Sequence, residues 1–135
     1  MKKFNHVIVR RPCRAMVDGI TSAPELGRPD YELALKEHDA YIEALKQCDV
    51  DVTILEANER YPDSCFVEDP ALITKECAII TNPGAESRNG EKFEIVDAVR
   101  KFFPEDRIEY IQAPGTLEGG DVMMVGKVYP LSRTF

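Results

Sequence analysis

Short segments rich in β-branched residues alternate along this chain with two longer segments of helical periodicity, and this alternation constrains the fold more than any other feature. The first helical segment begins after Asp30, a predicted N-cap, and continues through Gln47. The second begins at Gly90 and continues to Phe103, where Pro104 stops it. Strands or short extended segments are predicted over residues 4–11, 50–55, 65–67, 71–74, 77–81, 107–111 and 122–125. Strands that alternate with helices predict an α/β fold.

A weak internal repeat favours a particular kind of α/β fold. A proline-led turn, a short apolar step, acidic residues and an apolar strand follow one another from residue 61 and again from residue 113, which is a period of about 50 residues. A period of this size favours repeated supersecondary units over one doubly wound sheet. At 135 residues the chain is long enough for one domain and too short for two ordinary ones.

The composition excludes several classes of partner. Hydrophobic residues make up 44% of the chain and charged residues 30%, which is typical of a folded soluble protein. The formal net charge of −7 argues against nucleic-acid binding, because phosphate contacts need clustered Lys and Arg. No apolar segment approaches the roughly 20 residues that cross a bilayer, and the apolar stretch after Lys3 is too short for a signal peptide. We therefore expect a cytoplasmic protein.

The cysteines and histidines do not form a recognisable catalytic or metal motif. The four cysteines lack C-x-x-C spacing, and we expect reduced thiols, no metal ion and no cofactor. Cys65 lies among acidic residues, which disfavour the thiolate that a nucleophile needs. Neither His6 nor His38 has a nearby Cys or Ser in the sequence that would make a nucleophile–base pair, so both are interpreted as structural.

Acidic residues gather at the two copies of the repeat. Asp63, Glu68 and Asp69 lie close together in the first copy, and Glu118 and Asp121 lie in the second. Carboxylates at strand ends beside Pro and Gly turns can form a metal site, an acid–base pair or an anionic pocket for a guanidinium or ammonium group. The alternative is that they cap turns in water. Spacing typical of a metal loop is absent, so the metal site ranks lowest.

Several strings, taken in order, resemble the start of the dimethylarginine dimethylaminohydrolases. They begin with Arg10-Arg11-Pro12 and include the acidic motif from Pro62 to Asp69. The other matching segments are residues 17–21, 29–31, 38–42, 83–88 and 113–122. The resemblance covers about residues 4–126 and is strongest as an ordered set.

The resemblance implies a fold and a reaction. The fold would be part of a five-bladed β/α propeller of ββαβ units, with about two blades and the start of a third in a single partial domain over residues 1–135. The reaction would be hydrolysis of methylated arginine, a small-molecule substrate, to citrulline and a methylamine. A cysteine thiolate attacks the guanidinium carbon, a histidine protonates the departing amine, and water hydrolyses the thiouronium intermediate. An arginine deiminase-like reaction on unmethylated arginine is an open alternative.

The resemblance also implies roles for individual residues. Asp63 would bind the α-amino or guanidinium group of the substrate, and Glu68 and Asp69 would hold the guanidinium. Arg88 would pair with the substrate carboxylate. Glu118 would orient the catalytic histidine as the third member of a Cys-His-Glu set.

Two further residues receive implied roles near the ends of the matching region. Ile20 would contact substrate from a mobile lid that spans residues 13–30. Arg133 would be the counterpart of a second arginine that binds the substrate carboxylate.

The family's catalytic cysteine and histidine have no counterpart in these 135 residues. We therefore expect an amino-terminal half that is inactive alone. Open blade edges would favour self-association or a looser chain. The alternative is a non-catalytic half-propeller that binds a cationic amino acid or a partner chain carrying the other blades.

Overall fold

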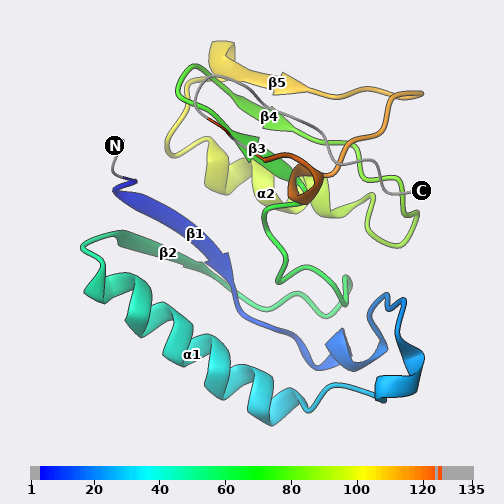
Figure 1. Ribbon diagram of the computed structural model, residues 1–135. Coiled ribbons are helices and arrows are strands. Elements are labelled where there is room, and N and C mark those ends of the chain that lie inside the picture. The colour runs from blue at the N-terminus through cyan, green and yellow to red at the C-terminus, as the bar shows by residue number, and fades with distance from the viewer. Residues whose placement is uncertain (1–3, 124, 126–135) are drawn as a thin grey trace. The chain divides into compact units, whose positions relative to one another are not determined.

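The computed structural model describes residues 4–123 and 125, and the chain divides into two compact units, Met1–Phe66 and Val67–Phe135. We call them the amino-terminal and carboxy-terminal units. Each combines strands with a helix, so the expected α/β class is confirmed (Figure 1). None of the helices within the described residues has the length and apolar character needed to cross a membrane.

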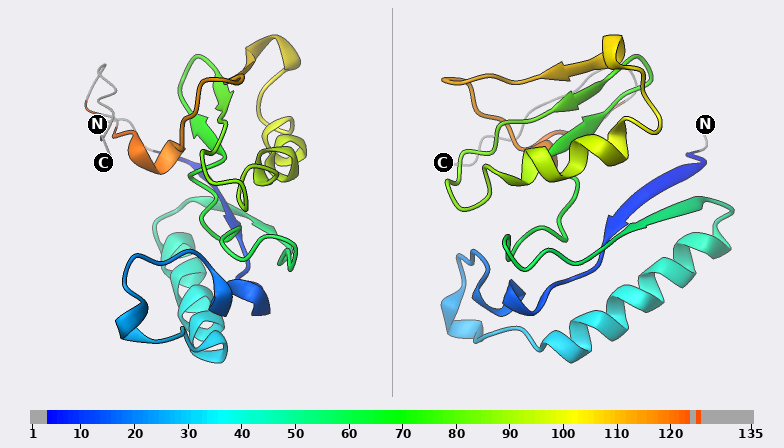
Figure 2. Two further views of the ribbon diagram at one scale, coloured as in Figure 1. Left: turned by 90° about the vertical axis from the view of Figure 1, so that its right-hand side faces the viewer. Right: turned by 180° about the vertical axis from the view of Figure 1, so that it is seen from behind.

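The amino-terminal unit is a βαβ unit. Strand β1 (His6–Arg10) is followed by helix α1 (Tyr31–Gln47) and strand β2 (Asp51–Leu55). The two strands are parallel, with His6 opposite Asp51 and Arg10 opposite Leu55. Parallel neighbours need a crossover connection, and α1 provides it, lying alongside the two strands in both views of Figure 2.

Helix α1 begins where the sequence predicted. The Asp30 carboxylate accepts a hydrogen bond from the Leu33 N–H at 3.0 Å, which satisfies one of the free donors of the first turn. Ile42 is the buried residue of α1 at 3% exposure, whereas Leu33 and Tyr41 are more than half exposed. Asp49, with φ of 56°, reverses the chain between α1 and β2.

The segment from residue 13 to residue 30, predicted as a loop, contains two short 3-10 helices, Arg14–Asp18 and Pro24–Leu26. Gly27 follows the second of them with φ of 83°, a conformation that favours glycine. Cys13, the first residue of this segment, is buried in the core of the unit at 1% exposure.

The carboxy-terminal unit has the strand order of a ββαβ unit. Strands β3 (Ala71–Ile73) and β4 (Ala78–Ile80) are antiparallel, and β4 pairs in parallel with β5 (Ile108–Tyr110). Helix α2 (Glu91–Val99) connects β4 to β5 and covers one face of this sheet (Figure 2). The core lies between them and includes Ala78, Ile80, Ile95, Val99 and Ile108.

Three local predictions differ from the structure. Helix α2 ends at Val99 rather than Phe103, because the Lys101 and Phe102 N–H groups bond three residues back and tighten the last turn. Phe93, which the helical period places on the same face as Val96 and Val99, is 72% exposed, whereas those two valines are buried. The segment 65–67 is a turn rather than an extended piece, since the Phe66 N–H bonds the Asp63 carbonyl.

The last predicted strand, residues 122–125, is not a continuous strand within the described residues. Val122 and Val125 each occupy a single β-bridge position, and position 124 lies outside the described residues. The preceding residues form a short 3-10 helix, Gly119–Asp121, where the sequence predicted only a turn.

Candidate substrate-binding site

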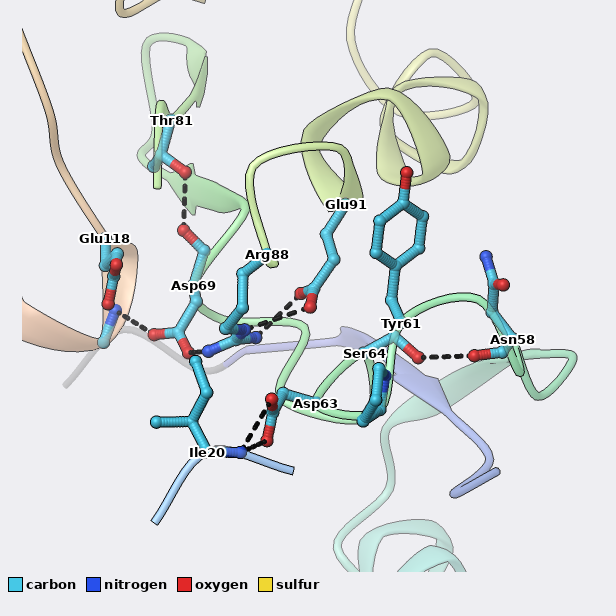
Figure 3. A network of polar contacts seen from close by, with 12 residues as sticks. Ile20, Asn58, Tyr61, Asp63, Ser64, Asp69, Thr81, Arg88, Glu91 and Glu118 are labelled. Carbon is cyan, nitrogen blue, oxygen red and sulfur yellow. Dashed lines mark hydrogen bonds and ion pairs between the residues drawn. The ribbon is translucent and has the colours of Figure 1, made fainter. Parts of the chain in front are cut away.

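In the amino-terminal unit, Asp63 is joined to the Ile20 backbone. Asp63 is 8% exposed, and its two carboxylate oxygens lie 3.2 and 3.1 Å from the Ile20 N–H (Figure 3). A side chain at Gly19 would collide with the Asp63 carboxylate, so glycine permits this approach. Two residues that are 43 positions apart in the sequence are thus brought together, with the Ile20 side chain left 60% exposed.

In the carboxy-terminal unit, Asp69 is held by four donors. Its side chain accepts hydrogen bonds from Arg88 Nη1 and from the Gly120 N–H at 3.1 Å (Figure 3). Its backbone carbonyl accepts from Thr81 Oγ1 at 2.6 Å and from the Gly119 N–H at 2.9 Å. Asp69 is therefore held between the loop that contains Thr81 and Arg88 and the Gly119–Gly120 segment, with two of the four bonds fixing its carboxylate.

Arg88 makes a second, bidentate ion pair with Glu91. Arg88 Nε and Nη2 donate to the two Glu91 carboxylate oxygens at 3.0 and 2.7 Å. The two residues are 8% and 3% exposed, so both charges are largely removed from water. Burial opposes the charged guanidinium, but the hydrogen bonds and charges of Glu91 and Asp69 outweigh it and raise the pKa of Arg88 above its ordinary value.

Glu91 was missed by the sequence reasoning. That reasoning considered acids beside Pro and Gly turns at strand ends, and Glu91 is instead the first residue of α2. The signal that could have found it is its position three residues after Arg88, a spacing at which opposite charges meet on a helix.

Glu118 and Glu68 flank this network. Glu118 Oε1 accepts a hydrogen bond from the Gly84 N–H at 3.1 Å. The Glu68 side chain is exposed, and a Cβ added to Gly120 would lie 3.7 Å from its Cγ. A Cβ added to Gly119 would collide with the Glu68 backbone carbonyl, so the chain approaches itself closely here.

The loop between β4 and α2, residues 81–90, is held by its own polar contacts. Asn82 forms a β-bridge with Leu117 and donates from its side chain to the Gly115 carbonyl at 2.7 Å. Asn89 Nδ2 and Lys92 Nζ both donate to Asn82 Oδ1, at 2.9 and 2.7 Å. These contacts join the loop that carries Gly84 and Arg88 to the segment that carries Glu118.

The structure thus brings Asp63 and the Ile20 backbone together in one unit. In the other it gathers Glu68, Asp69, Arg88 and Glu118 on neighbouring loops. Arg133 lies outside the described residues. The implied roles of these seven residues, Glu118 in catalysis and the other six in substrate binding, stay predictions.

The cysteines and histidines occupy other surroundings. Burial raises the pKa of the Cys13 thiol, and the nearby Glu59 charge raises it further. His6 Nε2 lies 2.8 Å from Thr53 Oγ1. His38 Nδ1 is buried without a hydrogen-bond partner, and burial and Arg11 lower the pKa of this histidine. Both shifts favour the neutral form of the side chain.

Comparison with known proteins identifies the relatives of the chain. Residues 28–129 match the family model described as N,N dimethylarginine dimethylhydrolase, eukaryotic. The chain is 58% identical over 123 residues to the N(G),N(G)-dimethylarginine dimethylaminohydrolase of Pseudomonas aeruginosa, an alignment that covers 91% of this chain and 48% of that protein. The chain therefore spans about half the length of this curated relative.

Solved structures agree with the sequence comparison. A complex of the Pseudomonas aeruginosa enzyme with citrulline, in which a cysteine is replaced by serine, has a TM-score of 0.92 and 56% identity, covering 95% of this chain and 49% of that one. AgrE, solved with ornithine and NAD+, has a TM-score of 0.75 at 15% identity over 90% of this chain and 18% of its own, which shows a shared fold alone. On these matches, the chain belongs to the dimethylarginine dimethylaminohydrolase family.

Proposed function

We propose that this chain forms the guanidinium-binding part of an enzyme that hydrolyses methylated arginine to citrulline and a methylamine. Family membership and the 58% identity to the Pseudomonas aeruginosa enzyme support this reaction. The ββαβ order of the carboxy-terminal unit supports a finer proposal for the fold, in which residues 1–135 form a single partial domain with about two blades and the start of a third of a five-bladed β/α propeller.

The observation that carries the proposal is the fixed carboxylate of Asp69. A guanidinium is a planar cation that carboxylates bind through charge-assisted, often bidentate, hydrogen bonds. Hydrogen bonds from Arg88 and from the Gly120 N–H already fix the Asp69 carboxylate, so its side chain loses little conformational entropy when a ligand binds. The exposed Glu68 carboxylate beside it provides a second acceptor.

The other implied roles are proposed on the same basis. Asp63 binds the α-amino or guanidinium group of the substrate, and Ile20 contacts substrate from the lid. Arg88 and Arg133 bind the substrate carboxylate.

Glu118 is proposed to orient the catalytic histidine. The Gly84 N–H bond leaves its second carboxylate oxygen available to accept from an imidazole N–H. A carboxylate in this position fixes the ring orientation and stabilises the imidazolium form, which can then protonate the departing amine.

These 135 residues alone are proposed to bind substrate without hydrolysing it. The attacking group must be a thiolate, and burial raises the pKa of the Cys13 thiol, which works against that form. The acid must be a protonated histidine, and burial and Arg11 lower the pKa of His38. The alternative, a non-catalytic binding module, predicts the same result for these 135 residues. The two hypotheses differ in whether citrulline forms when the longest protein product that contains these residues is assayed.

Two measurements on the purified chain test the proposal. Calorimetric titration with asymmetric dimethylarginine should show binding, and a citrulline assay should show no product. Asp69→Asn should weaken binding at least about tenfold, since one charge-assisted acceptor is lost. Asp97→Asn, an exposed carboxylate on α2, is the matched control and should bind as the unchanged chain does. Citrulline formation abolished by changing one of the four cysteines would contradict the proposed inactivity.

A further inference from the structure

We propose that Glu91 is a specificity-determining positioning residue, which keeps the binding site selective for a cationic guanidinium over the neutral urea group of the product. This inference rests on the proposed function. It concerns a buried carboxylate that acts through Arg88 on Asp69, entirely within the carboxy-terminal unit.

The geometry requires Glu91 to be ionised. Both of its carboxylate oxygens accept N–H groups from Arg88, whose guanidinium has donors and no acceptor. A protonated carboxyl group would direct an O–H at one of these donors. The bidentate pair therefore contains one full negative and one full positive charge.

The charges of this cluster do not cancel. Three carboxylates, those of Glu68, Asp69 and Glu91, accompany the single Arg88 guanidinium, so the four side chains carry a negative surplus. Arg88 pairs with both Asp69 and Glu91, and the charge of Glu91 offsets that of Arg88, so the charges of Asp69 and Glu68 remain as a net negative surplus that attracts a cation. Without Glu91, the charge of Asp69 would be balanced by Arg88, and the attraction for a cation would fall.

Burial makes this effect strong although Glu91 does not touch the ligand. The side chains of Arg88 and Glu91 are 10% and 3% exposed, so water and salt screen them weakly. The same carboxylate on the helix surface would be screened and would alter binding little. Burying a charge is costly, and its full pairing with Arg88 offsets that cost.

A comparison of two ligands separates this role from a structural one. Asymmetric dimethylarginine and citrulline share the same amino-acid end, and they differ in that one carries a guanidinium cation and the other a neutral urea. Any distortion of Arg88 that affects the shared end changes both dissociation constants alike. The electrostatic role changes their ratio, the Kd of citrulline divided by the Kd of dimethylarginine, in a direction set by the sign of the charge that is removed.

The experiment is a double-mutant cycle measured by calorimetry on the full chain. Glu91→Gln should lower this ratio about tenfold. Arg88→Gln should raise it, because a positive charge is removed, although both ligands should bind less tightly. The double variant should return the ratio close to that of the unchanged chain. Asp97→Asn, which removes an exposed charge from the same helix, should leave the ratio unchanged within about twofold.

Each outcome decides the matter. If Glu91→Gln weakens both ligands by the same factor, Glu91 is only structural and the inference is wrong. If Glu91→Gln does not fold, the Arg88→Gln variant is compared with the double variant instead, because neither contains a buried cation without a partner. A ratio that is not lower in the double variant than in Arg88→Gln contradicts the inference. Absence of binding of either ligand to the unchanged chain would overturn the proposed function and this inference with it.

Discussion

At the scale of single residues, the site depends on close backbone approaches that only glycine permits. Gly119 and Gly120 bring two N–H groups to Asp69, one to its carbonyl and one to its carboxylate. Two glycines in a row before an acid could have suggested a phosphate loop, but here they surround a carboxylate. Their function is to let an N–H group, rather than a side chain, face Asp69.

Gly119→Ala should therefore destabilise the chain. The added Cβ would collide with the Glu68 backbone carbonyl, which cannot move without displacing the Asp69 segment. We expect the free energy of unfolding to fall by about 1–3 kcal/mol in a urea titration. Gly84→Ala is the matched control, since its Cβ would meet the Thr116 side chain at an ordinary 3.9 Å. Equal stabilities of the two variants would show that the segment can shift without cost.

His38 should make stability depend on pH. Burial, followed by the Arg11 charge, lowers the pKa of His38 in the folded chain below the ordinary 6.5, although the Asp39 charge and a contact to the Arg10 backbone act the other way. As the pH falls through about 6.5, the unfolded chain takes up a proton that the folded chain does not, so the free energy of unfolding decreases.

The measurement is urea unfolding at several pH values between about 5.5 and 8. His38→Leu should flatten the curve in this range, because it removes the group whose pKa differs between the folded and unfolded chain. Glu37→Gln, an exposed change on the same helix, should keep the slope. A slope unchanged in His38→Leu would assign the pH dependence to other groups.

At the scale of elements, local patterns predicted the order of strands and helices, whereas the end of α2 and the burial of Glu91 were not predicted. The order of strands and helices followed from periodicity, and Asp30 was predicted as the cap of α1 because Asp at that position accepts a backbone N–H. The predicted end of α2 at Phe103 is four residues too late, because the apolar period continues to Phe103. The hydrogen bonds already change to a spacing of three residues after Val99. Glu91 was not predicted, because its spacing from Arg88 indicates only a possible ion pair, whereas its burial is visible only in the folded chain.

Asp30→Ala should destabilise helix α1. The substitution removes the acceptor for the Leu33 N–H and leaves that donor to water. We expect the free energy of unfolding to fall by about 1 kcal/mol, with a matching loss of helical circular dichroism on heating. Glu37→Ala, an exposed residue in the middle of α1, controls for removal of an acid and should change stability by less than about 0.5 kcal/mol.

At the scale of the whole molecule, each unit taken by itself has outer strands and exposed apolar side chains among the described residues. β1 and β2 form a two-stranded sheet, and β3 and β5 are the outer strands of a three-stranded one. Outer strands present unpaired N–H and C=O groups that can pair with another chain. Large apolar side chains are also exposed, among them Leu26 at 83% and Phe93 at 72%.

The 135-residue chain should therefore self-associate as its concentration rises. Sedimentation velocity should show a weight-average coefficient that increases with concentration, since association buries apolar surface and satisfies open strand edges. Phe93→Gln, on the exposed side of α2, should shift this rise to higher concentration, whereas Lys101→Gln, an exposed polar change just after the helix, should not. A single species of monomer mass at every concentration would instead mean that each unit is self-sufficient. In that case the exposed edges would be protected by their short length alone, because strands of three to five residues offer few groups for a partner chain to pair with.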